Sequence, residues 1–157
     1  MVPTKETGML PPTPSFPGCE AERQHTMRIS VLYVDEAPVL LDSVCRYLEI
    51  NGEMMADTSL TAEDAIEKMR YIHYHIIVTD YYSNNGEGYA LLRYLRNIGN
   101  CIPFVFFVFF RSDVLEEEAR RYSNVWFTDK PGSCSGSIFS DLYKTIIGAV
   151  KEVYLTI

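Results

Sequence analysis

The chain has 157 residues, of which 47% are hydrophobic and 22% charged, and its net charge is -7. This length and composition are typical of one soluble domain with a complete core. The acidic balance argues against nucleic acid as a partner, because phosphate backbones attract surfaces rich in Lys and Arg. The longest apolar run, Ile102 to Phe110, is too short for a membrane helix, which needs about 20 residues. The four cysteines include no C-x-x-C pair, so we expect free thiols in a cytoplasmic protein.

Residues 1–27 are rich in proline and polar residues. Such a segment cannot bury enough apolar surface to offset the entropy that it loses on ordering. We therefore predict a disordered arm over 1–27 and one folded domain over 28–155. Met27 could be an alternative start.

In the first half of the domain, two strands alternate with two helices. The first strand is predicted over Ile29–Val34, an apolar run that ends at a polar turn. A helix follows from Pro38, since proline suits the first helical turn. Met54–Asp57 indicates a weak second strand, and Thr61 should cap the second helix with Asp64 as its capping-box-like partner. The inward faces of these helices are predicted to consist of Leu41, Val44, Cys45 and Leu48, and of Ala62, Ala65, Ile66 and Met69.

The second half continues the alternation. A third strand is expected over His75–Thr79 and is followed by a helix. The unbroken apolar run Ile102–Phe109 is typical of a central parallel strand that is buried on both faces. Ser112 should cap the fourth helix, and Val125–Thr128 forms the fifth strand. The inward residues predicted for the last three helices are Leu91, Leu92, Leu95 and Ile98, then Leu115, Ala119 and Tyr122, and finally Ile138, Leu142, Ile146, Ala149 and Val153.

Five strands that alternate with five helices predict an α/β fold. Right-handed crossovers then give a doubly wound, five-stranded parallel sheet with helices on both faces.

Charged residues stand at the ends of three predicted strands. Asp35 and Glu36 follow the first strand, Asp80 the third and Lys130 the fifth. The carboxyl ends of parallel strands meet at one edge, where such sheets bind ligands. Clustered carboxylates need a cation, and Mg²⁺ is the natural candidate because it prefers oxygen ligands. With a lysine to hold a phosphoryl oxygen, these residues predict a site for a metal ion and a phosphoryl group, although each alone could simply solvate a strand end.

The same residues resemble the receiver domain of two-component response regulators over about residues 28–154. The first strand with its acidic pair, the strand Val78–Asp80 and the dipeptide Lys130-Pro131 carry the resemblance, and Ile102–Phe107 is similar to the family's fourth strand. The resemblance implies a flavodoxin-like fold of receiver type.

The resemblance also implies a chemistry. Asp80 would be the nucleophile that takes a phosphoryl group from a histidine kinase or phosphotransfer protein. Lys130 would contact Asp80 and then the phosphoryl group. Mg²⁺ would be bound by Asp35, Glu36, Asp80 and the backbone carbonyl of Tyr82. A homodimer is one assembly that the resemblance implies.

The sequence departs from the family's pattern at several positions. Val108 stands where Thr or Ser normally offers a hydroxyl to a phosphoryl oxygen, and Phe127 occupies the position of the switch aromatic residue. The other departures are Glu36 in place of the commoner Asp, Ser83-Asn84 in place of Met-Pro, and the bulky pair Phe109-Phe110. The output of the domain is therefore expected to differ from that of a typical receiver.

We weigh three functions. The first is a single-domain receiver that catalyses only its own phosphorylation and dephosphorylation and signals by binding a partner protein. The second is a pseudo-receiver, a protein-interaction module that works without phosphorylation. The third, a Mg²⁺-dependent phosphatase on the same fold class, ranks last because the string Asp35-Glu36-Ala37 lacks the D-x-D nucleophile motif.

Overall fold

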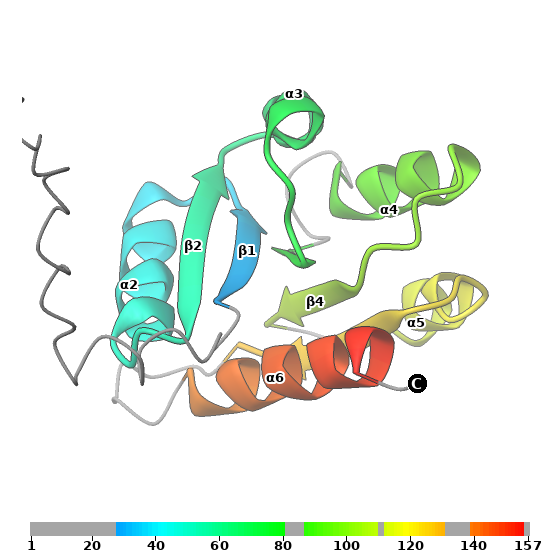
Figure 1. The fold of residues 1–157 in the computed structure, drawn as a ribbon. Coiled ribbons are helices and arrows are strands. Elements are labelled where there is room, and N and C mark those ends of the chain that lie inside the picture. Colours follow the sequence, from blue (N-terminus) through cyan, green and yellow to red (C-terminus); the bar gives the residue numbers. More distant parts are fainter. Residues whose placement is uncertain (1–27, 81–86, 110–111, 131–138, 156–157) are drawn as a thin grey trace, which may run out of the picture.

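The protein is described by a computed structural model that covers residues 28–80, 87–109, 112–130 and 139–155. Within these residues the strands form one parallel sheet in the order β2-β1-β3-β4-β5 (Figure 1). The strands are β1 (Ile29–Val34), β2 (Met54–Ser59), β3 (Ile76–Thr79), β4 (Phe104–Val108) and β5 (Val125–Asp129). The helices are α2 (Pro38–Glu49), α3 (Ala62–Tyr71), α4 (Glu87–Asn97), α5 (Asp113–Ala119) and α6 (Ser140–Tyr154). The predicted doubly wound α/β fold is confirmed.

Each face of the sheet is covered by its own set of helices. Successive strand residues point to opposite faces. Val31 and Val105 therefore belong to a core cluster with side chains of α2 and α6, whereas Leu32 and Phe104 belong to a second cluster with α3, α4 and α5. Every residue of β4 is buried, as expected for a central strand between two helical layers.

Both predicted N-caps are present. The Thr61 hydroxyl accepts a hydrogen bond from the Asp64 backbone N–H at 3.0 Å, and the Ser112 hydroxyl accepts one from Leu115 N–H at 3.5 Å. A side-chain oxygen at this position satisfies a helix donor that has no partner in the first turn. None of the described helices is long and apolar enough to span a membrane.

Some boundaries and side chains differ from the prediction. β2 runs on to Ser59, because pairing with β1 extends as far as Val34 despite the weak strand propensity of this segment. β4 begins at Phe104, since the preceding proline has no N–H for the ladder. The prediction that Ile98 faces the core is wrong: α4 ends at Asn97, and Ile98 is exposed. Of the described cysteines, Cys45 is half-buried, in line with its predicted place on an inward helix face, and Cys101 is exposed.

Candidate functional site

Three predicted site residues meet at the carboxyl edge of the sheet. Asp35 follows β1, Asp80 follows β3 and Lys130 follows β5. The Lys130 Nζ atom lies 2.8 Å from Asp35 Oδ2 and 2.9 Å from Asp80 Oδ2. β1 pairs with β2 on one side and with β3 on the other, so Asp35 and Asp80 stand at the topological switch point where such sheets bind ligands.

The charges of this triad are shielded from water. The Asp35 and Lys130 side chains are 8% and 3% exposed, and that of Asp80 is 14% exposed. Buried charges are tolerated only when they are paired and hydrogen-bonded. One ammonium group shared by two carboxylates meets this need but leaves an excess negative charge. The edge is therefore suited to a further cation.

Asp35 has two more hydrogen-bond donors. The Tyr33 hydroxyl donates to Asp35 Oδ2 at 3.0 Å, and the Ala37 backbone N–H donates to Oδ1 at 3.1 Å. Burial, together with the neighbouring Asp35 carboxylate, raises the pKa of Tyr33, so the phenol keeps its proton and remains a donor. Sequence reasoning missed Tyr33. The signal in the sequence was that Tyr33 lies two residues before Asp35, because residues two apart on a strand share one face.

Two aromatic rings surround the Lys130 ammonium group. Its Nζ atom lies 5.6 Å from the ring centroid of Phe107 and 5.0 Å from that of Phe109. Phe107 is fully buried, whereas Phe109 is 52% exposed. Contacts of a cation with ring faces at this range are attractive. Phe109 therefore places a half-exposed aromatic ring against the buried lysine.

The remaining predicted site residues are not part of the triad. Glu36 is exposed. Within the part of the chain that the structure describes, no three acidic, histidine or cysteine side chains lie close enough to hold a metal ion, so Glu36 is not gathered with Asp35 and Asp80. Val108 is fully buried at the end of β4. The arm 1–27, Tyr82, Ser83-Asn84, Phe110, Pro131 and Ile138 lie outside the described residues, and the predictions made for them stay predictions.

Phe127 is half-buried between neighbours. Its ring stacks on that of Phe106 at a centroid distance of 5.3 Å, and the Arg120 guanidinium carbon lies 5.3 Å from its centroid. These contacts hold the ring against β4. Its predicted role as a switch stays a prediction.

The donor set fits Mg²⁺ in chemistry and in charge. Mg²⁺ takes oxygen ligands and keeps several waters, so one or two carboxylates suffice to hold it. Asp35, Asp80 and Lys130 together carry one excess negative charge, and Glu36 at the rim would add another. A divalent cation would balance both. Asp35 already accepts three hydrogen bonds, which leaves it little capacity for a metal.

The first turn of α4 packs against the backbone of Asp80. A Cβ atom at Gly88 would lie 2.6 Å from the Asp80 carbonyl oxygen and 3.1 Å from Thr79 Cγ2. Real Cβ atoms do not approach backbone this closely, so only glycine lets the helix begin here. Gly88 thus fixes the end of β3 that carries Asp80.

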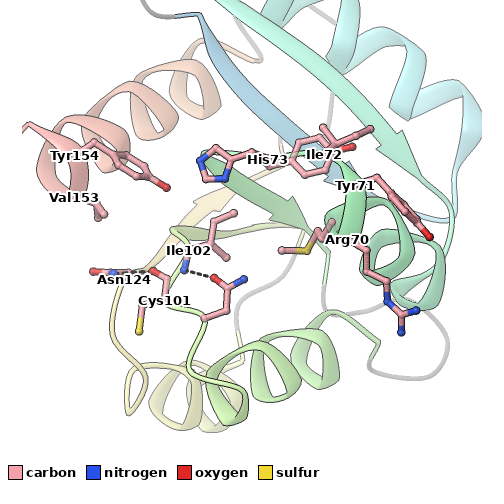
Figure 2. A pocket seen from close by; sticks show the side chains of 12 residues that line it. Arg70, Tyr71, Ile72, His73, Cys101, Ile102, Asn124, Val153 and Tyr154 are labelled. Carbon is pink, nitrogen blue, oxygen red and sulfur yellow. Dashed lines mark hydrogen bonds between the residues drawn. The ribbon is translucent and has the colours of Figure 1, made fainter.

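A separate hollow of about 500 Å³ opens at the opposite, amino edge of the sheet (Figure 2). Figure 2 shows Tyr71, His73, Cys101 and Tyr154 among the side chains around it. They come from the end of α3, from the segments before β3 and β4 and from the end of α6. The carboxylate–lysine triad is thus not part of this hollow.

No family profile matches this sequence, and no curated protein sequence does. Solved structures do match. A two-component response regulator from Clostridium difficile is 20% identical with a TM-score of 0.69, over 81% of this chain and 99% of that one. The receiver domain of a putative Luxo repressor protein from Vibrio parahaemolyticus is 17% identical with a TM-score of 0.71, over 82% and 95%. The beryllofluoride-activated NtrC4 receiver domain dimer is 22% identical with a TM-score of 0.65, over 78% and 97%.

These matches cover nearly all of the matched chains and most of this one. The chain therefore has the fold of response regulator receiver domains, as the sequence resemblance predicted.

Proposed function

We propose that this chain is a receiver in which Asp80 accepts a phosphoryl group from the phosphohistidine of a histidine kinase or phosphotransfer protein. One observation carries the proposal. The Lys130 ammonium group lies within 2.9 Å of both carboxylates at the carboxyl edge of a sheet with the receiver fold. A nucleophilic carboxylate with a fixed cation beside it is what transfer of a charged phosphoryl group requires.

The transfer balances with groups in the protein and its donor. An Asp80 oxygen attacks phosphorus and forms a P–O bond, while the P–N bond to the donor imidazole breaks; the electron pair goes to that nitrogen, and the imidazole leaves neutral because its other ring nitrogen carries a proton. Lys130 is held in place by Asp35, so it can stay at the edge and contact the phosphoryl oxygens once Asp80 is esterified.

Mg²⁺, when bound, would neutralise the charge of the phosphoryl oxygens. Asp80, Asp35, Glu36 and the Tyr82 carbonyl are the predicted ligands. Glu36 follows Asp35 directly and is exposed at the same edge.

The test is intact mass after incubation with a small-molecule phosphodonor, with and without Mg²⁺. Wild type should gain one phosphoryl group in the presence of Mg²⁺, and Asp80→Asn should gain none. Asp129→Asn is the matched control, because Asp129 is an exposed carboxylate at the end of β5, on the same edge of the sheet. Uptake that persists in Asp80→Asn, or no uptake by wild type under any condition, would refute the proposal.

The second candidate is a pseudo-receiver, a binding module that needs no phosphorylation. Its support is Val108, which is fully buried and has no hydroxyl for a phosphoryl oxygen. It predicts no mass gain and unchanged affinity for a partner after Asp80→Asn. A receiver that works by phosphorylation predicts that the affinity depends on Asp80.

The signal would pass through binding of another protein, and we expect no turnover of free phosphate esters. A homodimer is one form of output to test, because the similar NtrC4 receiver domain is a dimer when activated by beryllofluoride. Light scattering with and without beryllofluoride would show whether the mass of this protein doubles.

A further inference from the structure

The buried hydroxyl of Tyr33 adds one interaction to the site. The ring is fully buried in the cluster shared with α2 and α6, where a phenylalanine ring would fill the same space. A buried hydroxyl needs a hydrogen-bond partner, and that of Tyr33 donates to Asp35 Oδ2 at 3.0 Å. What distinguishes tyrosine from phenylalanine here is therefore its contact with a carboxylate of the site.

This contact takes up part of the capacity of Asp35 to bind a metal. A carboxylate offers about four lone-pair positions. Asp35 uses three of them, for the Tyr33 hydroxyl, the Lys130 ammonium and the Ala37 N–H. Each donor also withdraws negative charge from the oxygen that it contacts. A cation must then share a carboxylate that is already largely neutralised, or displace one of its donors.

The same contact gives Asp35 a further donor that is not a metal. Lys130 is shared with Asp80, so Asp35 receives only part of its positive charge. The Tyr33 hydroxyl adds a neutral hydrogen-bond donor to that carboxylate. Asp35 is thereby held facing Lys130 in the metal-free protein.

We propose that Tyr33 is a positioning residue that commits Asp35 to Lys130 and thereby weakens the affinity of the site for a divalent cation. The inference rests on the proposed function for the identity of its metal site. It adds that this chain sets its own cation requirement through one phenol hydroxyl.

The test compares wild type with Tyr33→Phe, using Mn²⁺ as the probe. Electron paramagnetic resonance measures free Mn²⁺ directly, so the affinity is obtained without any phosphorylation. Tyr33→Phe should bind Mn²⁺ about tenfold more tightly, because one lone pair of Asp35 is released. Circular dichroism establishes that the variant is folded.

Tyr74→Phe is the matched control. Tyr74 is also buried, and its hydroxyl donates to the carboxylate of Asp57 on the edge strand β2. Both substitutions remove a tyrosine–carboxylate hydrogen bond, but only Tyr33→Phe should tighten Mn²⁺ binding. A second control is Tyr33→Phe in an Asp35→Asn background, where the hydroxyl should have no further effect on affinity.

Four outcomes would overturn the inference. They are equal or weaker Mn²⁺ binding by Tyr33→Phe, equal tightening by Tyr74→Phe, tightening that persists without the Asp35 charge, and no Mn²⁺ binding by either protein. Phosphodonor uptake on the same samples separates the two proposals. Tighter Mn²⁺ binding without uptake leaves the role of Tyr33 standing and refutes phosphorylation. Phosphoryl uptake with unchanged Mn²⁺ affinity refutes the role of Tyr33 and leaves phosphorylation standing.

Discussion

Replacing Lys130 with methionine removes the cation that the two carboxylates share. The lysine side chain is 3% exposed, and Asp35 is 8% exposed. Removing one partner of a buried ion pair costs about 3–5 kcal/mol, because the remaining charge is left uncompensated. The lower end of this range is expected, since Asp35 keeps the Tyr33 hydroxyl and Asp80 is partly open to water. Methionine is unbranched and polarizable, so it can still fill the space beside the aromatic rings.

Urea unfolding in the presence of a chelator measures this loss, and repeating it with Mg²⁺ tests its cause. Without Lys130 the carboxylates attract a divalent cation more strongly, so Mg²⁺ should stabilise Lys130→Met more than wild type. A free cation at a hundred times its Kd stabilises by about 2.7 kcal/mol. Adding Asp80→Asn to Lys130→Met should recover part of the loss, because one of the two unpaired charges is removed.

The control is Lys151→Met on α6, where an exposed lysine is lost and the change should stay within about 0.5 kcal/mol. A Lys130→Met protein that unfolds within about 1 kcal/mol of wild type in chelator would refute the reasoning. The triad would then contribute no more than surface pairs do.

Three further substitutions test separate features. Burial and the neighbouring His73 imidazole lower the pKa of His75, so the unfolded chain takes up a proton before the folded protein does. The free energy of unfolding should therefore fall as the pH drops below about 6.5. His75→Asn can still accept the Ser30 N–H bond, and urea unfolding at several pH values should show a flatter dependence for this variant. Gly88→Ala should lower the free energy of unfolding by about 1–3 kcal/mol, because the added Cβ would displace the Asp80 backbone. The same displacement should reduce phosphoryl uptake in the intact-mass assay. Val108→Thr should lower the free energy of unfolding by about 1–3 kcal/mol, because it buries an unpaired hydroxyl. Thermal unfolding with beryllofluoride should show a smaller loss of stability, since the phosphoryl mimic offers that hydroxyl a partner.

The fold could be predicted because its signals are local. The caps at Thr61 and Ser112 and the apolar run through β4 each report their own element, and alternation of strands and helices leaves few topologies. What could not be predicted depends on contacts between distant segments. β2 continues through Asp57 to Ser59 by pairing with β1, although aspartate is depleted in strands.

The site, too, has residues that the sequence could predict and others that it could not. Asp35, Asp80 and Lys130 could be predicted to meet, because parallel strands bring their carboxyl ends to one edge. Glu36 was predicted to join them; it lies in a bend after β1 and is exposed, whereas Asp35 is buried, so its role as a ligand stays a prediction. The role of Tyr33 depended on whether a buried hydroxyl reaches a carboxylate two residues on, which spacing permits but does not establish.

Accepting a phosphoryl group and responding to it require different side chains. Acceptance needs a carboxylate with a fixed cation beside it, and Asp80 with Lys130 meets that need. The response requires a group whose position changes when the phosphoryl group arrives. Val108 offers no hydroxyl for this purpose, and Phe127 is already held by Phe106. If the proposed function holds, phosphoryl uptake and a change in partner affinity should therefore be measured separately, and the absence of the second would not argue against the first.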